Sequence, residues 1–65
     1  GNNMNRENKR WLTPKDLEIE QKIMRSTQAK YRMKRLIPFS KIGKFIRYDR
    51  YEIDKWLESN KVVGA

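Results

Sequence analysis

The sequence contains no cysteine and no histidine among its 65 residues. Disulfide bonds are therefore excluded, and so are the usual structural zinc sites, which are built from these two residue types. The common pairs of nucleophile and general base are also missing, and there is no glycine-rich phosphate-binding loop. We therefore expect a protein that is not an enzyme, with no catalytic residue, no bound metal, no cofactor and no small-molecule substrate.

Long apolar runs are also missing from the sequence. The longest ones, such as Leu36–Phe39 and Val62–Ala65, are far shorter than a membrane-spanning helix, which needs about 20 residues. Nothing resembles a signal peptide. We therefore expect a soluble protein without a membrane partner, and the lack of cysteine is compatible with the reducing cytoplasm.

A chain of this length predicts one small domain with a thin core. Its first ten residues, Gly1–Arg10, contain no apolar side chain except Met4 and are rich in asparagine and charge, so we expect a disordered tail. One interpretation of Gly1–Asn3, which precede Met4, is a remnant of cloning. The domain itself is expected at residues 11–60, followed by a C-terminal tail at residues 61–65.

The charges are segregated along the chain. Sixteen Lys and Arg residues against eight Asp and Glu give a net charge of +8. Nine of the basic residues lie in the 26-residue stretch Lys22–Arg47, which contains no acidic residue. Like charges at this density repel one another unless a polyanion neutralises them. We favour a nucleic-acid-binding surface over a merely solvated one, and an anionic membrane is a weaker alternative because Pro38 and Gly43 interrupt the stretch.

Sequence signals place the first helix at Pro14–Gln21. Thr13 is a favoured N-cap, proline is favoured at the first helical position, and Asp16 completes a capping box. Leu12 and Leu17 are spaced to pack together as a hydrophobic staple. The start of this helix is therefore the most strongly marked boundary in the sequence.

A second helix and a hairpin are expected to follow. After a turn at Lys22–Arg25, a helix of about ten residues should end at Arg35 or Leu36, because Pro38 prevents further growth. Two runs rich in aromatic and β-branched residues are then expected to pair as strands: Phe39–Ile42 and Phe45–Tyr48. Gly43–Lys44 between them fits a type II′ turn.

The sequence predicts a third helix at Arg50–Asn60. Asp49 and Glu52 have the spacing of a second capping box, and the apolar residues that follow fall at i, i+3 and i+4: Ile53, Trp56 and Leu57. A domain this small needs every large apolar side chain in its core. We therefore assign five aromatic residues to the core: Trp11, Phe39, Phe45, Tyr48 and Trp56.

Four segments mark the joints of these elements: Leu12–Leu17, Ser26–Arg32, Ile37–Gly43 and Arg47–Leu57. In this order and spacing they resemble the excisionase-type winged helix-turn-helix family, which is related to the MerR-like superfamily of DNA-binding domains. The resemblance covers Trp11–Leu57 without a gap. It implies a mainly α fold with a small β-hairpin, in the order helix, turn, helix, hairpin, helix. Three positions depart from the family pattern, where Glu18 replaces a frequent alanine, Lys22 a usual glycine and Met24 a usual serine.

The resemblance implies that the second helix is the recognition helix in the major groove, and that the hairpin is a wing on the DNA backbone or minor groove. Periodicity and resemblance disagree on how this helix is oriented. Ala29, Met33 and Leu36 are spaced as an apolar stripe, whereas the family pattern buries Gln28 and Tyr31. We follow the family pattern, because tyrosine has more bulk to bury. The face toward DNA is then Ser26, Thr27, Ala29, Lys30, Met33 and Lys34.

The candidate DNA-binding residues are Arg25, Ser26, Thr27, Lys30, Arg32, Lys34, Lys41, Lys44 and Arg47. The two lysines of the helix are predicted to reach guanine edges or phosphates, while the arginines of the helix and the wing residues contact phosphate or the minor groove. For Arg47, pairing with a nearby acid is an alternative. Ser26 and Thr27 would bind phosphate or base edges, with helix capping as the alternative. For Ala29 and Met33, close contact with bases competes with core packing, which we favour.

The resemblance implies double-stranded DNA as the partner, and it suggests an excisionase that helps an integrase to remove a mobile element. The integrase, or further copies of the chain on adjacent sites, would be its protein partners, in a bacterial or phage-encoded, nucleoid-associated setting. A small phage or plasmid transcription regulator is the alternative. Two other functions stay open: a protein-binding adaptor, through the third helix and Lys61–Ala65, and RNA binding, which the narrow major groove of A-form RNA disfavours.

Overall fold

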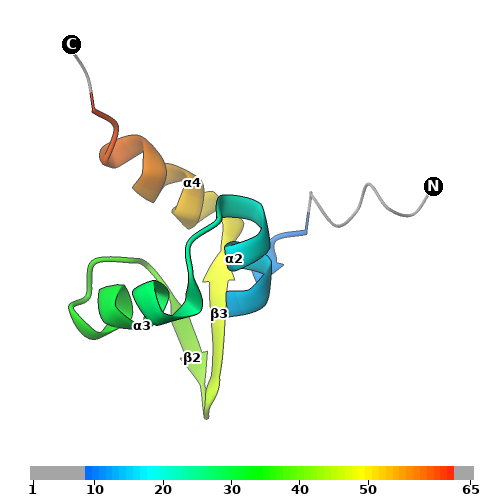
Figure 1. The fold of residues 1–65 in the computed structure, drawn as a ribbon. Coiled ribbons are helices and arrows are strands. Elements are labelled where there is room, and N and C mark those ends of the chain that lie inside the picture. The colour runs from blue at the N-terminus through cyan, green and yellow to red at the C-terminus, as the bar shows by residue number, and fades with distance from the viewer. Residues whose placement is uncertain (1–8, 63–65) are drawn as a thin grey trace.

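The described part of the chain, residues 9–62, forms three helices and a three-stranded antiparallel sheet in a computed structural model (Figure 1). In chain order the elements are β1 (Trp11–Leu12), α2 (Pro14–Gln21), α3 (Arg25–Met33), β2 (Ser40–Ile42), β3 (Phe45–Asp49) and α4 (Arg50–Ser59). The predicted order of helix, helix, hairpin and helix is confirmed, whereas the sequence patterns did not predict β1. Residues 1–8 and 63–65, which make up most of the predicted tails, lie outside the described residues.

Helix α2 has the bounds that its capping signals predict. Thr13 Oγ1 accepts a hydrogen bond from the Asp16 N–H at 3.1 Å, and the Asp16 carboxylate accepts one from the Thr13 N–H at 3.0 Å. After the helix, Lys22 has a left-handed φ of 60° and donates its N–H to the Glu18 carbonyl at 2.8 Å. This backbone conformation favours glycine. Helix α3 then begins at Arg25, the last residue of the predicted turn.

Helix α3 ends earlier than predicted, at Met33 rather than at Arg35 or Leu36. Arg35 has a left-handed φ of 59°, and its N–H donates to the Arg32 carbonyl at 3.0 Å. The N–H of Leu36 donates to the Tyr31 carbonyl at 2.8 Å. These two bonds form a Schellman motif, which ends a helix. The predicted end was wrong because this motif usually contains glycine, and an arginine gives no such signal.

Strands β2 and β3 form the predicted hairpin. Ile42 pairs with Phe45 and Ser40 with Arg47, on either side of the Gly43–Lys44 turn. Gly43 has a φ of 62°, which the first central residue of a type II′ turn requires. This turn lies at the end of β3 opposite to α4 (Figure 1). The hairpin therefore projects away from the third helix.

Strand β1 extends the sheet on the other side of β3. Its two residues pair with the end of β3, Trp11 with Asp49 and Leu12 with Tyr48. The backbone N–H of Arg50 then donates to the Arg10 carbonyl at 2.7 Å. The segment before α2 is thus tied to the start of α4, which closes the N-terminal part of the domain against its C-terminal helix.

Helix α4 begins after Asp49, as predicted, but its N-cap differs from the expected capping box. The Asp49 carboxylate accepts a hydrogen bond from the Tyr51 N–H at 3.1 Å, and each of its oxygens accepts one from the Arg10 guanidinium at 3.3 Å. Glu52 is exposed to solvent and does not complete the predicted capping box, so the prediction of that box was wrong. The helix ends at Ser59, one residue before its predicted end.

The core is small and lies between the helices and one face of the sheet. Its buried apolar residues are Leu12, Leu17, Ile37, Tyr48 and Ile53, and the half-buried Tyr31, Phe39, Ile46 and Trp56 pack against them. The prediction that Trp11 and Phe45 belong to the core is wrong, because these side chains are 45% and 56% exposed. Successive residues of a strand point to opposite faces, so Phe45 cannot share the inner face with Ile46 and Tyr48. Trp11 is exposed for the same reason, because it pairs with Asp49, and Asp49 points to the same outer face of β3 as Phe45.

Candidate nucleic-acid interface

Gln28 fixes the orientation of α3 from inside the domain. Its side chain is completely buried, and its Nε2 donates to the carbonyls of Pro14 at 3.0 Å and Ile23 at 2.9 Å. Its Oε1 accepts a hydrogen bond from the Tyr48 hydroxyl at 2.9 Å. One side chain thereby connects α3 with the start of α2, with the turn between the helices and with β3. The expectation that Gln28 is buried is confirmed. Tyr31, which was expected in the core, is half-buried and packs against the core with its ring beside Trp56.

The opposite side of α3 is exposed to solvent. Because successive helical residues are about 100° apart, the buried Gln28 places four residues on the outer surface: Ser26, Ala29, Lys30 and Met33. All four are exposed, Met33 to 84%. The favoured core packing of Ala29 and Met33, and the apolar stripe that they would form with Leu36, are therefore wrong. The physical reason is that a buried amide with three hydrogen bonds determines the inner face here, rather than apolar spacing.

The hydroxyls at the start of α3 do not cap the helix in the described structure. The N-cap residue is Met24, which makes no side-chain capping hydrogen bond. Ser26 and Thr27 lie inside the first turn. The backbone N–H groups of this turn are a favourable place for an anion, because helix dipoles concentrate partial positive charge at the N-terminus.

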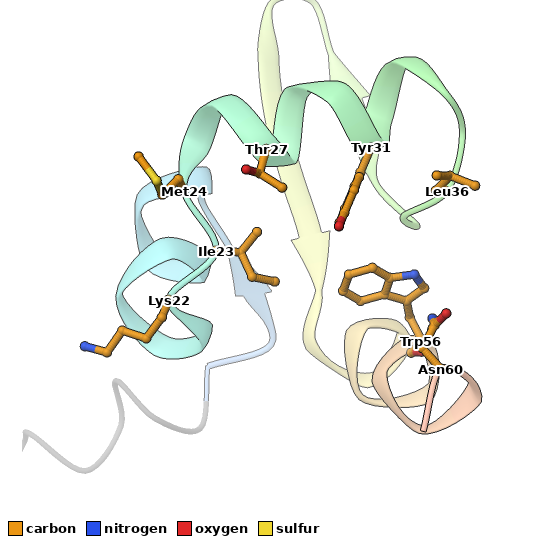
Figure 2. Close-up of a pocket in the computed structure, with 8 residues that line it drawn as sticks. All are labelled: Lys22, Ile23, Met24, Thr27, Tyr31, Leu36, Trp56 and Asn60. Atoms are coloured by element: carbon orange, nitrogen blue, oxygen red, sulfur yellow. The ribbon is translucent and has the colours of Figure 1, made fainter. Parts of the chain in front are cut away.

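Thr27 lies on the side of α3 that faces α4, in an apolar groove of about 680 Å³ (Figure 2). Ile23, Met24, Tyr31, Leu36 and Trp56 supply its apolar lining, with Lys22 and Asn60 as its other members. The rings of Tyr31 and Trp56 meet edge to face with centroids 6.2 Å apart. Figure 2 shows Thr27 and Tyr31 pointing from α3 into this space. The structure thus separates Thr27 from the outer residues Ala29 and Met33.

A second groove, of about 470 Å³, lies between α3 and the hairpin. It is lined by Ala29, Arg32, Met33, Phe39, Lys41, Lys44 and Ile46. Three of the predicted DNA-binding residues, Arg32, Lys41 and Lys44, thus come together although they belong to three different parts of the chain. Strand alternation accounts for this, because Lys41 pairs with Ile46 on the face of the hairpin that looks toward α3. We call these three residues the groove cations.

A chain of hydrogen bonds holds Arg32 at this groove. Its Nη1 donates to the Tyr48 hydroxyl, which in turn donates to Gln28 Oε1. Burial raises the pKa of Tyr48 above its ordinary value, although the bond from Arg32 opposes this. The hydroxyl therefore stays protonated and remains a donor to Gln28. The sequence did not indicate this network, because its members lie 16 and 20 residues apart.

The other predicted cations do not line this groove and lie in different environments. Arg25 forms an exposed ion pair with Glu18 at 3.0 Å. Lys34 is exposed at the C-terminal end of α3. Arg47 lies on the outer face of the hairpin, where its Nη1 donates to the Ile46 carbonyl at 2.7 Å and its guanidinium lies over the Phe45 ring at 5.7 Å. The alternative that Arg47 pairs with an acid is not seen within residues 9–62.

Ion pairs neutralise several of the acidic residues but leave most cations of the basic stretch without an acidic partner. Asp16 and Glu20 of α2 pair with Lys9 at 2.8 Å and with Arg50 at 3.0 Å. Asp49, at the end of β3, pairs with Arg10 at 3.3 Å. Hydrogen bonding from Arg10 lowers the pKa of Asp49, and hydrogen bonding to Glu20 raises the pKa of Arg50. By contrast, no ion pair within residues 9–62 involves Lys30, Lys34 or the groove cations.

Two further properties of the described residues bear on the candidate site. No group of three or more acidic, cysteine or histidine side chains in residues 9–62 is arranged to hold a metal ion. None of the helices there combines the length and apolar character that crossing a membrane requires. No protein-family model, no curated protein and no solved structure matches this chain.

Proposed function

We propose that this chain is a winged helix-turn-helix domain that binds double-stranded DNA through α3 and the β2–β3 hairpin. The observation that carries the proposal is the groove between these two elements, into which the groove cations converge. Within residues 9–62 none of them has an acidic partner. A phosphodiester backbone supplies the missing negative charge, and its binding is driven by the release of condensed counterions.

The outer surface of α3 suits insertion into a major groove, which is about as wide as a helix. Ser26 and Ala29 are small and allow the helix backbone to come close to the bases. Lys30 is exposed and bears the donor that guanine O6 and N7 accept, while Met33 is an apolar contact for a thymine methyl group. In this arrangement the groove cations bind the phosphates beside the helix and fix its register.

Within this function we propose an excisionase, on the resemblance of four segments to that family. A small transcription regulator is the alternative, and it would use the same surface. In both cases several copies bind adjacent sites, because one helix and one wing read too few base pairs for genomic specificity. An integrase gene beside the coding gene favours the excisionase, whereas a divergent promoter that carries the binding site favours the regulator.

The direct test compares duplex affinities of three variants by fluorescence anisotropy. Lys30→Ala and Lys34→Ala each remove one uncompensated cation from α3, and we expect each to weaken binding about five- to tenfold. Lys55→Ala is the matched control, because it removes the same charge from the exposed surface of α4. Circular dichroism should show an unchanged fold in all three. Wild-type affinity in both α3 variants would exclude α3 from the interface.

One observation favours the alternative of a protein-binding adaptor. The apolar groove between α3 and α4 exposes Met24 and Leu36 beside Trp56, and such a surface suits a protein side chain better than a phosphate. If the chain fails to bind duplex DNA at low ionic strength, this groove becomes the first place to look for a partner.

A further inference from the structure

Two large apolar side chains lie at the tip of the hairpin, outside the core. Ile42 is 70% exposed and Phe45 is 56% exposed. They pair directly across the strands next to the Gly43–Lys44 turn, so their side chains share the outer face of the hairpin. A domain with five buried apolar residues thus leaves two more large apolar side chains exposed beside the hairpin turn. Packing within the domain does not account for this placement.

Two cations flank this pair. Lys44 Nζ lies 6.0 Å and the Arg47 guanidinium 5.7 Å from the centroid of the Phe45 ring. The nearest acid along the strand is Asp49, whose carboxylate is bound by Arg10. An apolar tip between cations is complementary to a groove that has stacked bases at its floor and phosphates on both sides. A DNA minor groove has this character.

We propose that Ile42 and Phe45 form a wedge that the hairpin inserts against a base step in the minor groove and thereby unstacks that step. Phenylalanine and isoleucine are side chains that minor-groove proteins use in this way. Lys44 and Arg47 then contact the phosphates on either side of the opened step. The inference rests on the proposed function, since α3 must hold the domain in the neighbouring major groove for the tip to reach the minor groove.

The wedge can be removed without losing the hairpin. The opposite face of the hairpin is anchored to the core through Ile46 and the buried Tyr48, and a cross-strand pair such as Ile42–Phe45 contributes little beyond that anchoring. Threonine keeps the β-branched shape that strands favour but cannot stack on a base. Phe45→Thr and Ile42→Thr are therefore the test variants. Ile19→Thr is the matched control, because it removes an apolar side chain that is 50% exposed from α2.

The experiment uses duplexes that carry 2-aminopurine, a base analogue whose fluorescence rises when it unstacks, at TA steps, which unstack most easily. Binding is followed by anisotropy on the same duplexes. We expect the wild type and Ile19→Thr to raise the fluorescence at saturation about twofold or more. In Phe45→Thr and Ile42→Thr most of this rise should be lost, while the affinity falls about tenfold or less.

The outcomes separate the two proposals. Duplex binding without a fluorescence rise, or a rise that both threonine variants retain, overturns the wedge and leaves DNA binding in place. A tighter complex with the unpaired strand than with the duplex also overturns it, because the aromatic tip would then be a platform for single-stranded bases. Absence of duplex binding at low ionic strength removes the proposed function and the wedge together.

Discussion

Gln28 is the residue on which the orientation of α3 depends. Inside the domain, its amide nitrogen donates hydrogen bonds to the Pro14 and Ile23 carbonyls. Its amide oxygen accepts one from the Tyr48 hydroxyl. Gln28→Leu removes all three bonds and leaves the buried Tyr48 hydroxyl without its acceptor, so we expect the free energy of unfolding to fall by about 2 to 4 kcal/mol in urea titrations. Gln21→Leu, at an exposed position of α2, should change it by less than about 0.5 kcal/mol. Equal effects of the two substitutions would contradict this role of Gln28.

Lys22 is a residue whose backbone conformation conflicts with its side chain. Its left-handed φ of 60° is costly for any residue with a Cβ atom and free of strain for glycine. We expect Lys22→Gly to raise the free energy of unfolding by about 0.5 to 1 kcal/mol. Lys34→Gly, at the C-cap of α3 where φ is −88°, should lower it instead. Chemical denaturation of both variants checks the sign, and a loss in Lys22→Gly would contradict the assigned strain.

At the scale of elements, the junction between β1 and α4 makes stability depend on pH. The hydrogen bonds from Arg10 lower the pKa of Asp49. Partial burial alone would raise the pKa of Asp16, but hydrogen bonds from Lys9 and Thr13 outweigh it and lower that pKa as well. A carboxyl group whose pKa is lower in the folded than in the unfolded chain stabilises the fold at pH values above its unfolded pKa, which is about 3.9 for aspartate. This stabilisation is lost as the pH falls through the pKa of the folded state.

We therefore expect the melting temperature to fall as the pH drops below about 4. Asp49→Asn keeps an N-cap acceptor for α4 but loses the ion pair with Arg10. It should melt at a lower temperature near neutral pH and lose less on acidification than the wild type. Asp54→Asn, at an exposed position of α4, serves as the control in the same series of circular dichroism melts. Parallel acid profiles of wild type and Asp49→Asn would rule out the contribution of this junction.

The elements that could be predicted from the sequence are those with local chemical signals. The capping residues Thr13 and Asp16 predicted the start of α2, and Gly43 predicted the hairpin turn. Strand β1 could not be predicted, because two residues are too few to show an alternating pattern. Phe45 could have been placed correctly, since it and Tyr48 are three residues apart in one strand and must face opposite sides.

At the scale of the whole molecule, the segregation of charge in the sequence becomes a segregation of surfaces. Three acids, Asp16, Glu20 and Asp49, are paired with cations from outside the basic stretch. Within residues 9–62, Arg25 alone among the basic residues of Lys22–Arg47 has an acidic partner, which leaves α3 and the hairpin positive. The sequence could predict which residues are basic, and the family resemblance could predict that Gln28 is buried. The sequence could not predict that Arg32 lies in one groove with Lys41 and Lys44, because their meeting depends on how α3 and the hairpin pack through Tyr48.

The most direct test of the central claim is the salt dependence of duplex binding by the wild-type chain. Anisotropy titrations of a labelled random duplex, and of a matched RNA hairpin, are repeated over a range of salt concentrations. If α3 and the hairpin bind phosphates, the logarithm of the DNA affinity falls linearly with the logarithm of salt, by about 0.9 for each phosphate contact. A slope that corresponds to several contacts, with weaker binding of the RNA, is the predicted result. No binding of the duplex at low salt, or an affinity independent of salt, would contradict the account.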